Sequence, residues 1–492
     1  MSEESKNSFL LSHWLFVRLL AIIFLIAFVS LWVQIIGLVG SNGILPAAEY
    51  LSFAEEEFPD DFYIKFPTLM WFNISDLTLH LLCGFGVLFS ILFFIGIVNL
   101  FSIVALVVLY ISLSTVSQVF LGFQWDNLLL ETGFLTIFSL PFVFNLGFNK
   151  LFQSNKYVLF LFKLLLFKLV FFSGLVKILS GDYVWGNLTA LTYHYETQPI
   201  SNIIAYYVHH FPFWFHKISC ITMFLVELVV PFSIFAFPLL RRIGCLSLIL
   251  FQILILITGN YCFFNLLTIA LSLLLLDDYF WCLIFPHLKS RMNALVRVKS
   301  FWNKKLILAF VSFVVVINSF LLFRILGLND PIIKPLGNLY YSIYQFRIIN
   351  SYGLFAVMTR TRPEVIVEGS NDGIHWDEYE FKFKAGDLSK PPPFVAPHQP
   401  RLDWQMWFAA LGNIQRNLWF VNFCVKLLED SQDVLKLVGK NPFPEKAPRY
   451  IRALLYNYKF SSLEERKNTG NWWKRELVGV YLPVISLEGL SK

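Results

Sequence analysis

The sequence predicts a polytopic α-helical membrane bundle of about nine spans over residues 1–327, followed by a β-rich soluble domain with a helical insertion over residues 328–492. Hydrophobic residues make up 57% of the chain and charged residues only 15%, whereas soluble proteins contain about 45–50% and about 25%. Apolar runs of about 20 residues, the length that crosses a bilayer, recur through the first part. Beyond residue 328, polar and apolar residues alternate between Gly and Pro turns, which is typical of strands.

The apolar runs define nine candidate spans. The first run is long and no small-residue cleavage pattern follows it, so we expect it to remain as a transmembrane helix. The seventh and eighth runs are divided by the Thr-Gly-Asn sequence at residues 258–260, which favours a turn. The predicted spans are residues 15–39, 77–98, 101–122, 128–148, 157–179, 215–239, 243–259, 262–284 and 306–327.

The charges of the loops predict the orientation of the bundle. Lys and Arg in short loops concentrate on the cytoplasmic side. With nine spans, one face receives Lys150, Lys156, Arg241, Arg242, Lys289, Arg291, Arg297, Lys299, Lys304 and Lys305. The other face receives the acidic residues 55–61, the corner at residues 125–127 and the loop 181–214. We therefore expect a cytoplasmic N-terminus and a non-cytoplasmic C-terminal domain. The net charge of +6 then reflects topology, and the partner is the lipid bilayer rather than nucleic acid.

In the soluble domain, segments rich in Val, Ile, Tyr, Phe and Trp predict strands. The sequence Asp372-Gly373 predicts a tight turn, because Asp-Gly readily supplies positive φ. Five prolines predict an extended segment over residues 390–400, and helical spacing predicts the insertion over residues 403–411 and 416–428. The predicted strands are residues 352–358, 364–368, 376–383, 450–460 and 473–485.

Common catalytic motifs are missing from the sequence. It contains no Gly-x-Ser-x-Gly nucleophile elbow, no phosphate-binding Gly-x-x-x-x-Gly-Lys, no dinucleotide fingerprint and no His-Glu-x-x-His. The six cysteines include no Cys-x-x-Cys, so a disulfide framework and thiol redox chemistry are not indicated. We therefore predict no catalytic residue, no cofactor, no metal site and a protein that is not an enzyme.

The densest group of polar side chains lies in the loop after the fifth predicted span. Histidines and carboxylates in such a group bind metals or carry out acid–base catalysis. An aromatic-rich loop at a membrane edge is also typical of an interfacial belt or a docking site, and the spacing favours this structural role. The candidate residues are Asp182, Trp185, His194, Glu196, His209 and His210.

Ionisable residues inside the spans form a second group of candidates, because charges in hydrocarbon are costly and usually face partners in the bundle. This group comprises Arg18, Lys163, Lys168, Lys177 and Glu227. Near the outer end of the fourth span lie Asp126 and Glu131. Lys177 has a similar depth, so the sequence predicts that it pairs with one of these two carboxylates, either to fix the packing or to line a pocket.

Several runs of residues closely resemble the lipase maturation factor family. In the membrane part they include Gln-Trp-Asp-Asn-Leu-Leu-Leu-Glu-Thr-Gly-Phe at 124–134 and Phe-Ser-Gly-Leu-Val-Lys at 172–177, and the others are 185–199, 209–212 and 259–265. In the soluble domain they are 368–373 and 397–407. The resemblance implies a membrane protein that helps dimeric secreted lipases, such as lipoprotein lipase, to fold and assemble. It also implies the endoplasmic reticulum membrane in a eukaryote, and the inner (plasma) membrane would replace it in a bacterium.

Two functions follow as hypotheses. The first is a non-enzymatic assembly factor that binds clients through the soluble domain, with candidate contacts at His398, Arg401, Asp403, Trp404 and Trp407, unless these tryptophans fill a core. The second arises because the membrane part is also similar to that of vitamin K-dependent carboxylases. It is a membrane enzyme acting on a lipid or quinone substrate, with Lys177, Asp182, His194, Glu196 and His209 around an outward-facing pocket. A cavity between spans four to six would favour this second hypothesis.

Overall fold

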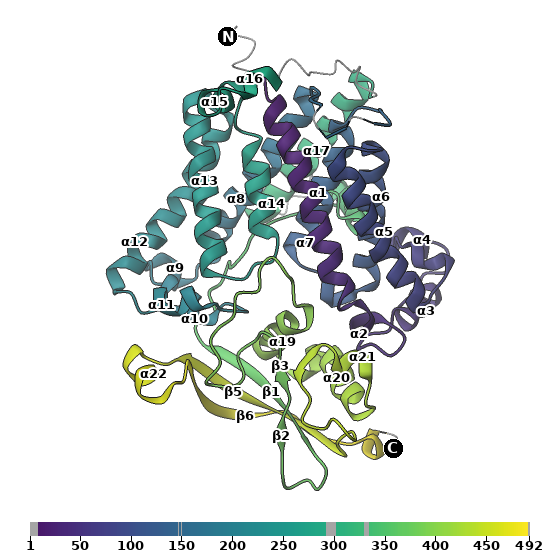
Figure 1. Ribbon diagram of the computed structural model, residues 1–492, viewed down its shortest axis with the longest axis vertical. Helices are drawn as coiled ribbons and strands as arrows, with labels where there is room; N and C mark the ends of the chain where they lie inside the picture. The colour runs from purple at the N-terminus through teal and green to yellow at the C-terminus, as the bar shows by residue number, and fades with distance from the viewer. Residues whose placement is uncertain (1–7, 146, 149, 292–301, 329–333, 491–492) are drawn as a thin grey trace.

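The computed structural model describes residues 8–145, 147–148, 150–291, 302–328 and 334–490. Seven helical stretches in these residues are long and apolar enough to cross a membrane, and they form one bundle (Figure 1). They are α1 (Leu10–Trp32), α5 (Asp76–Ile95), α6 (Asn99–Val116), α8 (Lys156–Leu179), Phe213–Phe235, α13 (Pro238–Thr258) and α17 (Lys304–Ile325). The fifth stretch consists of α12 (Phe213–Phe224), the π-helical segment η4 (Leu225–Val229) and the 3-10 segment η5 (Val230–Phe235).

The two remaining predicted spans are shorter than expected. Helix α7 (Gln124–Ser139) has 16 residues and is largely buried, and it ends at Ser139 because Pro141 forces the residue before it into an extended conformation. The eighth span is broken into α14 (Phe264–Leu273) and α15 (Asp278–Ile284), which are bent by 99° from each other. With α7 and this broken pair counted, the prediction of about nine spans is confirmed, although the boundaries differ.

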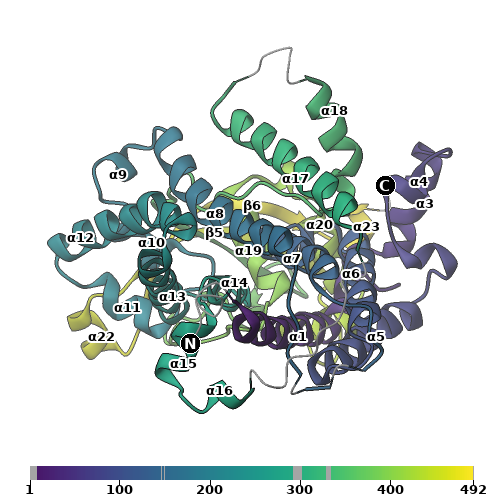
Figure 2. The ribbon, with the colours of Figure 1, turned by 90° about the horizontal axis from the view of Figure 1, so that it is seen from above.

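The N-terminus and the soluble domain lie at opposite ends of the bundle (Figure 1). At the N-terminal end, the backbone N–H groups of Leu10 and Leu11 donate to Asp278, and the neighbouring Asp277 accepts from Arg241 and Arg242. This end therefore gathers the N-terminus and basic loops, as the loop charges predict. Arg297 and Lys299 lie outside the described residues. Along the bundle axis, α8 lies centrally and contacts α7, α14, α17 and η4 (Figure 2).

Short helices extend the two ends of the bundle (Figure 1). Helix α16 (Leu288–Arg291) lies beside α15 at the N-terminal end. At the opposite end are α2 (Ile35–Val39), α3 (Ala47–Glu57), α4 (Phe62–Lys65), η2 (Leu69–Phe72), η3 (Gln118–Leu121), α9 (Tyr183–Gly186), α10 (Leu191–Thr197) and α11 (Ile203–His209). The acidic residues 55–61 belong to this second group.

The soluble domain contains a four-stranded antiparallel sheet with the order β2-β1-β5-β6. Its strands are β1 (Arg362–Ser370), β2 (Asp377–Glu378), β5 (Tyr450–Phe460) and β6 (Trp473–Ile485), and β3 (Glu380–Phe381) pairs with β4 (Val438–Lys440). Strand β6 is therefore an edge of the larger sheet. Its helices are α19 (Arg401–Leu411), η9 (Ile414–Arg416), α20 (Leu418–Leu428), α21 (Gln432–Leu435), α22 (Leu463–Thr469) and α23 (Leu487–Leu490). Helix α18 (Lys334–Ile343), which is followed by η8 (Tyr344–Phe346), packs instead against α17 of the bundle, where Tyr340 contacts Phe320.

The predicted strand over residues 352–358 is wrong. Its backbone groups bond to side chains of the bundle instead of a neighbouring strand: the N–H of Gly353 donates to Gln124 Oε1 (3.1 Å) and that of Met358 to Asp182 Oδ2 (2.8 Å). Periodicity could not reveal partners in another domain. The predicted strand over residues 376–383 shrinks to the two-residue strands β2 and β3, whereas the tight turn is present, with Gly373 at φ 76°.

The soluble domain is not a separate body on a tether. One continuous hydrophobic core runs from the bundle into α19, joining Phe120 and Leu128 of the bundle to Leu402, Trp404 and Met406. Burying apolar surface across this junction favours a docked domain, because about 25 cal/mol is gained for each Å² removed from water. Polar contacts then determine how the domain sits.

Candidate functional site

A buried ion pair fastens α19 to the bundle. The Arg401 guanidinium donates to both carboxylate oxygens of Asp126, at 2.6 and 2.8 Å, and both side chains are almost fully buried. Asp126 also accepts from the Tyr110 hydroxyl (2.6 Å). Such a bidentate pair between buried groups is strong and directional. It fixes the N-terminal end of α19 against α6 and α7.

The segment before α19 is held by α1. The Ser30 hydroxyl contacts His398 Nδ1 and accepts from the N–H of Gln399, both at 2.9 Å. Gln34 accepts from the N–H of Arg401 (2.8 Å) and donates to the carbonyl of Gln399. Burial, together with the Arg401 and Lys382 charges, lowers the pKa of His398 to about 4, so this ring is neutral at pH 7.

The turn between α13 and α14 holds the proline-rich segment. Asn260 Oδ1 accepts from the N–H groups of Val395 (2.8 Å) and Ala396, and its amide donates to the carbonyl of Pro393. A turn that was predicted at residues 258–260 thus recognises backbone of the soluble domain. The prolines of this segment cannot donate hydrogen bonds to a sheet, so the asparagine supplies polar partners for the remaining backbone groups.

Glu131 forms the second buried polar centre of the junction. One oxygen pairs with Lys168 Nζ (2.5 Å), and the other accepts from the Tyr352 hydroxyl (2.7 Å) and from the backbone N–H of Asn350 (3.0 Å). A buried carboxylate needs several donors to offset its lost hydration. Glu131 thereby draws the irregular segment around residue 352 into the bundle.

Asp182 and Trp185 hold the next part of the same segment. Asp182 accepts from the N–H of Met358 and from Arg360 (2.9 Å), and the Trp185 indole donates to the carbonyl of Phe355 (3.1 Å). Desolvation alone would raise the pKa of the Asp182 carboxyl, but these hydrogen bonds outweigh it and lower the pKa below its usual value. Asp182 is therefore a carboxylate with a structural partner.

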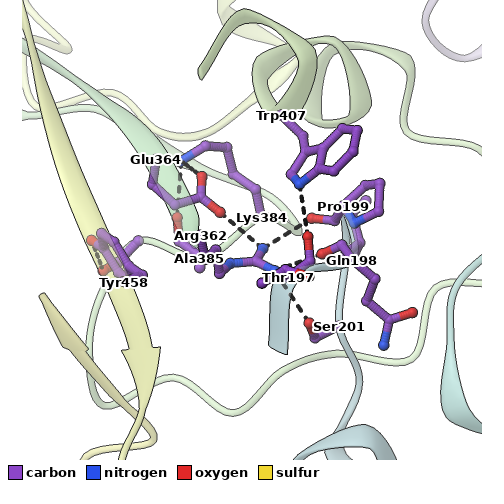
Figure 3. Close-up of polar contacts among 12 residues, drawn as sticks. Thr197, Gln198, Pro199, Ser201, Arg362, Glu364, Lys384, Ala385, Trp407 and Tyr458 are labelled. Atoms are coloured by element: carbon purple, nitrogen blue, oxygen red, sulfur yellow. Dashed lines mark hydrogen bonds and ion pairs between the residues drawn. The ribbon is translucent and has the colours of Figure 1, made fainter. Parts of the chain in front are cut away.

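Figure 3 shows a third polar centre, which sequence reasoning missed. Arg362, at the start of β1, donates to the carbonyls of Glu196, Gln198 and Pro199 at 2.6–2.9 Å and pairs with Glu364. The Trp407 indole donates to the carbonyl of Thr197 beside it (2.9 Å). One guanidinium thus satisfies three carbonyls at the end of α10. No local sequence signal reveals this role, because Arg362 lies in a strand far from that loop.

The predicted client-binding residues lie in this junction rather than on the surface. Arg401, Asp403, Trp404 and Trp407 are buried, and His398 is half-buried. Asp403 accepts from the N–H groups of Phe383 and Lys384 inside the domain. Their burial matches the alternative that these residues form a core.

The predicted pair between Lys177 and Glu131 or Asp126 is wrong. Lys177 Nζ instead contacts both oxygens of Glu227, at 2.8 and 2.9 Å, and Glu227 lies in the π-helical segment η4. Helix α8 and η4 approach closely at this point, because a Cβ added to Gly174 of α8 would lie only 2.9 Å from Glu227 Cβ. The sequence predicted Glu131 or Asp126 as the partner because these carboxylates lie at a depth similar to that of Lys177. The partner is instead the carboxylate on η4, which packs against α8.

The remaining loop residues contact different partners, and no cluster of three metal-ligating side chains occurs in the part of the chain that the structure describes. Glu196 accepts from the N–H of Phe460 (2.8 Å), and burial raises its pKa. Burial and the neighbouring His210 and His216 lower the pKa of His209 to about 4, so its 3.8 Å contact with Glu196 is not an ion pair at pH 7. His210 contacts the carbonyl of Tyr206.

A cavity of about 500 Å³ lies between α8, α12 and α13, next to α10 and α11. Its wall is mostly apolar, and Ile218, Leu254 and Ile257 at its edge are exposed where the bundle meets lipid. The Lys177–Glu227 pair lines its inner side. This shape suits an amphipathic molecule that enters sideways from the bilayer.

His194 lines the cavity, and one nitrogen of its ring is buried without a hydrogen-bond partner among the described residues. The Tyr261 hydroxyl donates to Gln198 Oε1 (2.9 Å), so His194 Nε2 must donate to that hydroxyl (3.2 Å). Nδ1 is then a buried acceptor without a partner among the described residues. Burial and the nearby Lys177 ammonium lower the pKa of His194 to about 4, so it is neutral at pH 7.

The outer edge of the soluble domain is open and apolar. Strand β6 pairs only with β5 in the described part of the chain, and its other edge faces away from the bundle (Figure 1). Val478 and Val480 are 61% and 65% exposed, and Leu477 and Val484 are also exposed. An unpaired apolar edge strand is a template for another extended chain.

Comparison with known proteins assigns both parts of the chain. Residues 11–283 match the family description "Lipase maturation factor transmembrane domain", and residues 348–483 match "Lipase maturation factor C-terminal domain". The chain is 35% identical to Lipase maturation factor 1 of Mus musculus, covering 99% of this chain and 89% of that protein. It is 34% identical to Lipase maturation factor 2 of Xenopus laevis, covering 95% and 81%. No solved structure matches.

Proposed function

The chain belongs to the lipase maturation factor family, and on this premise we propose that it is a non-enzymatic assembly factor for secreted lipases or similar clients. The observation that carries the proposal is the exposed apolar edge of β6 on a domain held firmly to the membrane. A partly folded client offers extended segments with unpaired backbone groups. Such a segment adds to β6 as a further strand, and Val478 and Val480 contact its apolar side chains.

The junction residues have a supporting role in this proposal. Buried pairs such as Arg401–Asp126 keep the sheet at a fixed height above the membrane, so β6 meets clients near the surface from which they emerge. His398, Asp403, Trp404 and Trp407 belong to the same joint. We propose that clients contact β6 instead of these residues.

The orientation of the chain is part of the proposal. We expect the N-terminus in the cytoplasm and the soluble domain in the lumen of the endoplasmic reticulum, or outside the inner membrane in a bacterium, because the basic loops gather at the N-terminal end. A reporter fused after Trp302 should read cytoplasmic, and one fused after Lys492 non-cytoplasmic. Two reporters on the same side would contradict the ninth crossing.

Charging the edge of β6 should weaken client binding. The double variant Val478→Lys, Val480→Lys places two ammonium groups where an apolar strand is expected to pack, and we predict at least about a tenfold loss of affinity. The measurement is recovery of a co-expressed secreted lipase with the purified factor, together with lipase activity in the medium. Ile374→Lys is the matched control, because Ile374 is an exposed apolar residue of the same domain outside β6. If the double variant binds the lipase as well as the Ile374→Lys control does, the result counts against the proposal.

The cavity favours a second candidate function, binding or conversion of a lipid or quinone. Its apolar wall fits the body of such a molecule, and the Lys177–Glu227 pair on its inner side would contact the polar end. Filling the cavity with Ile218→Trp separates the two functions. An assembly factor acting through β6 keeps most of its activity, whereas a lipid-dependent enzyme loses it.

A further inference from the structure

A second, smaller cleft opens at the N-terminal end of the bundle, far from the soluble domain. Its volume is about 260 Å³, and it lies between the beginning of α1, the beginning of α8 and the corner where η5 meets α13. Three basic residues line it, namely Lys156, Lys163 and Arg241. The other walls include Ser154 and the apolar rings of Phe160 and Phe235.

Among the residues that the structure describes, the basic side chains of the cleft outnumber the carboxylates near them. Arg241 shares the single carboxylate of Asp277 with Arg242, and Asp278 is engaged by the backbone N–H groups that begin α1. Lys156 and Lys163 have no ion pair with any residue that the structure describes. Lys163 instead lies over the ring of Phe9, 4.8 Å from its centroid, and Arg241 lies over the same ring at 5.0 Å.

Two further groups in the cleft lack partners within the described residues. The Ser154 side chain is 8% exposed, and its hydroxyl forms no hydrogen bond. Arg241 uses its Nε on the carbonyl of Leu275 and its Nη2 on Asp277, which leaves Nη1 free. Two ammonium groups and a guanidinium N–H on residues that line one cleft match the oxygens of a phosphate group.

The depth of Lys163 argues against a simple topological explanation. Basic residues in loops are expected at a cytoplasmic membrane surface. Lys163, however, lies seven residues after Lys156 within α8, about 10 Å further along the helix. A charge at that depth is costly without an anionic partner. A bound anion at the mouth of the cleft would supply one.

The apolar side of the cleft fits an anion that carries hydrocarbon. Phe160 and Phe235 contact each other with ring centroids 6.0 Å apart, and both are exposed at the surface that faces lipid. We propose that this cleft binds the phosphate of an anionic glycerophospholipid from the leaflet at the N-terminal end. Lys156, Lys163 and Arg241 hold the phosphate, and an acyl chain lies along the two rings. Basic pockets between helices bind anionic headgroups in this way.

Lipid binding by the purified full-length protein tests this site. We measure the rise in thermal midpoint in detergent, and the number of lipids retained in native mass spectrometry, with dioleoyl-phosphatidylglycerol and with zwitterionic dioleoyl-phosphatidylcholine. Phosphatidylglycerol should stabilise the protein and phosphatidylcholine much less, because a ligand that binds only the folded state raises its stability. Lys163→Met and Lys156→Gln should each weaken binding about fivefold, the effect of about 1 kcal/mol per cation.

Control variants distinguish specific binding in the cleft from general attraction of the lipid to a positively charged surface. Lys305→Gln removes an exposed lysine at the same end of the bundle but outside the cleft, and it should bind phosphatidylglycerol like the unaltered protein. If Lys163→Met fails to fold, Lys156→Gln carries the test. Equal losses in Lys305→Gln and the cleft variants, or equal binding of both lipids, would overturn the proposal. Full competition by inorganic phosphate would show a site for free phosphate instead of a lipid.

Discussion

Replacing Arg401 by methionine is expected to lower the free energy of unfolding by about 3–5 kcal/mol, because the buried carboxylate of Asp126 would lose its only ionic partner among the described residues. The Tyr110 hydroxyl alone cannot offset that charge. Since the pair joins the two domains, the soluble domain should also loosen. Thermal unfolding in detergent measures the first effect, and limited proteolysis of the segment before α19 measures the second.

The exposed Arg416 of the same domain supplies the control. Arg416→Met should leave stability within about 0.5 kcal/mol, as surface substitutions usually do. Asp126→Asn combined with Arg401→Met should cost less than the sum of the single variants, because no buried charge is then left unpaired. If Arg401→Met is as stable as Arg416→Met, the ion pair is not what holds the domain.

Lys177→Met should cost a similar amount, about 3–5 kcal/mol, because Glu227 would remain charged and buried in the bundle. Double variants test whether Glu227 is the partner of Lys177. Glu227→Gln together with Lys177→Met should recover part of the loss, whereas Glu131→Gln should not, since Glu131 pairs with Lys168. Thermal unfolding in detergent compares these variants.

Lys217→Met is the matched control for this series, because Lys217 is an exposed lysine on the neighbouring helix α12. It should unfold like the unaltered protein. A Lys177→Met variant of unchanged stability would mean that water or a ligand in the cavity already solvates Glu227. That result would strengthen the second candidate function.

Much of the architecture could be predicted from the sequence because bilayers impose simple lengths. Apolar runs located every crossing, and the charges of the loops grouped the basic segments at one end, where Arg241 and Arg242 meet Asp277. Strands β5 and β6 were predicted with their observed bounds, because β-branched and aromatic residues fill them. These patterns involve residues that are close in the chain, so they can be recognised in a single sequence.

The candidate site was harder to predict because its partners are far apart in the chain. Asp126, Glu131, Asp182 and Trp185 were predicted as candidates, and each of them has a partner more than 150 residues away, in the soluble domain or the segment before it. Polar residues of a membrane-edge loop resemble a catalytic centre and a docking joint equally well in sequence. Only the geometry distinguishes a carboxylate that is satisfied by Arg401 from one that is free to act.

Arg362 and residues 352–358 were also predicted incompletely because their partners are far away in the chain. Arg362 reads as an ordinary start of a strand, although it satisfies three carbonyls of the bundle. Residues 352–358 alternate like a strand, but side chains of α7 and the loop before α9 replace a neighbouring strand. Hydrogen-bond partners from another domain override periodicity, and a single sequence does not reveal them.

Site-specific photocrosslinking tests the central claim, that clients bind at β6, most directly. A photoreactive phenylalanine analogue is placed singly at Val478, at Ile374 or at Ile218, and each factor is co-expressed with a secreted lipase. We expect lipase adducts from position 478, with background levels from position 374 in the same domain and from position 218 beside the cavity. Adducts confined to position 218, or none above background at position 478, would contradict the claim.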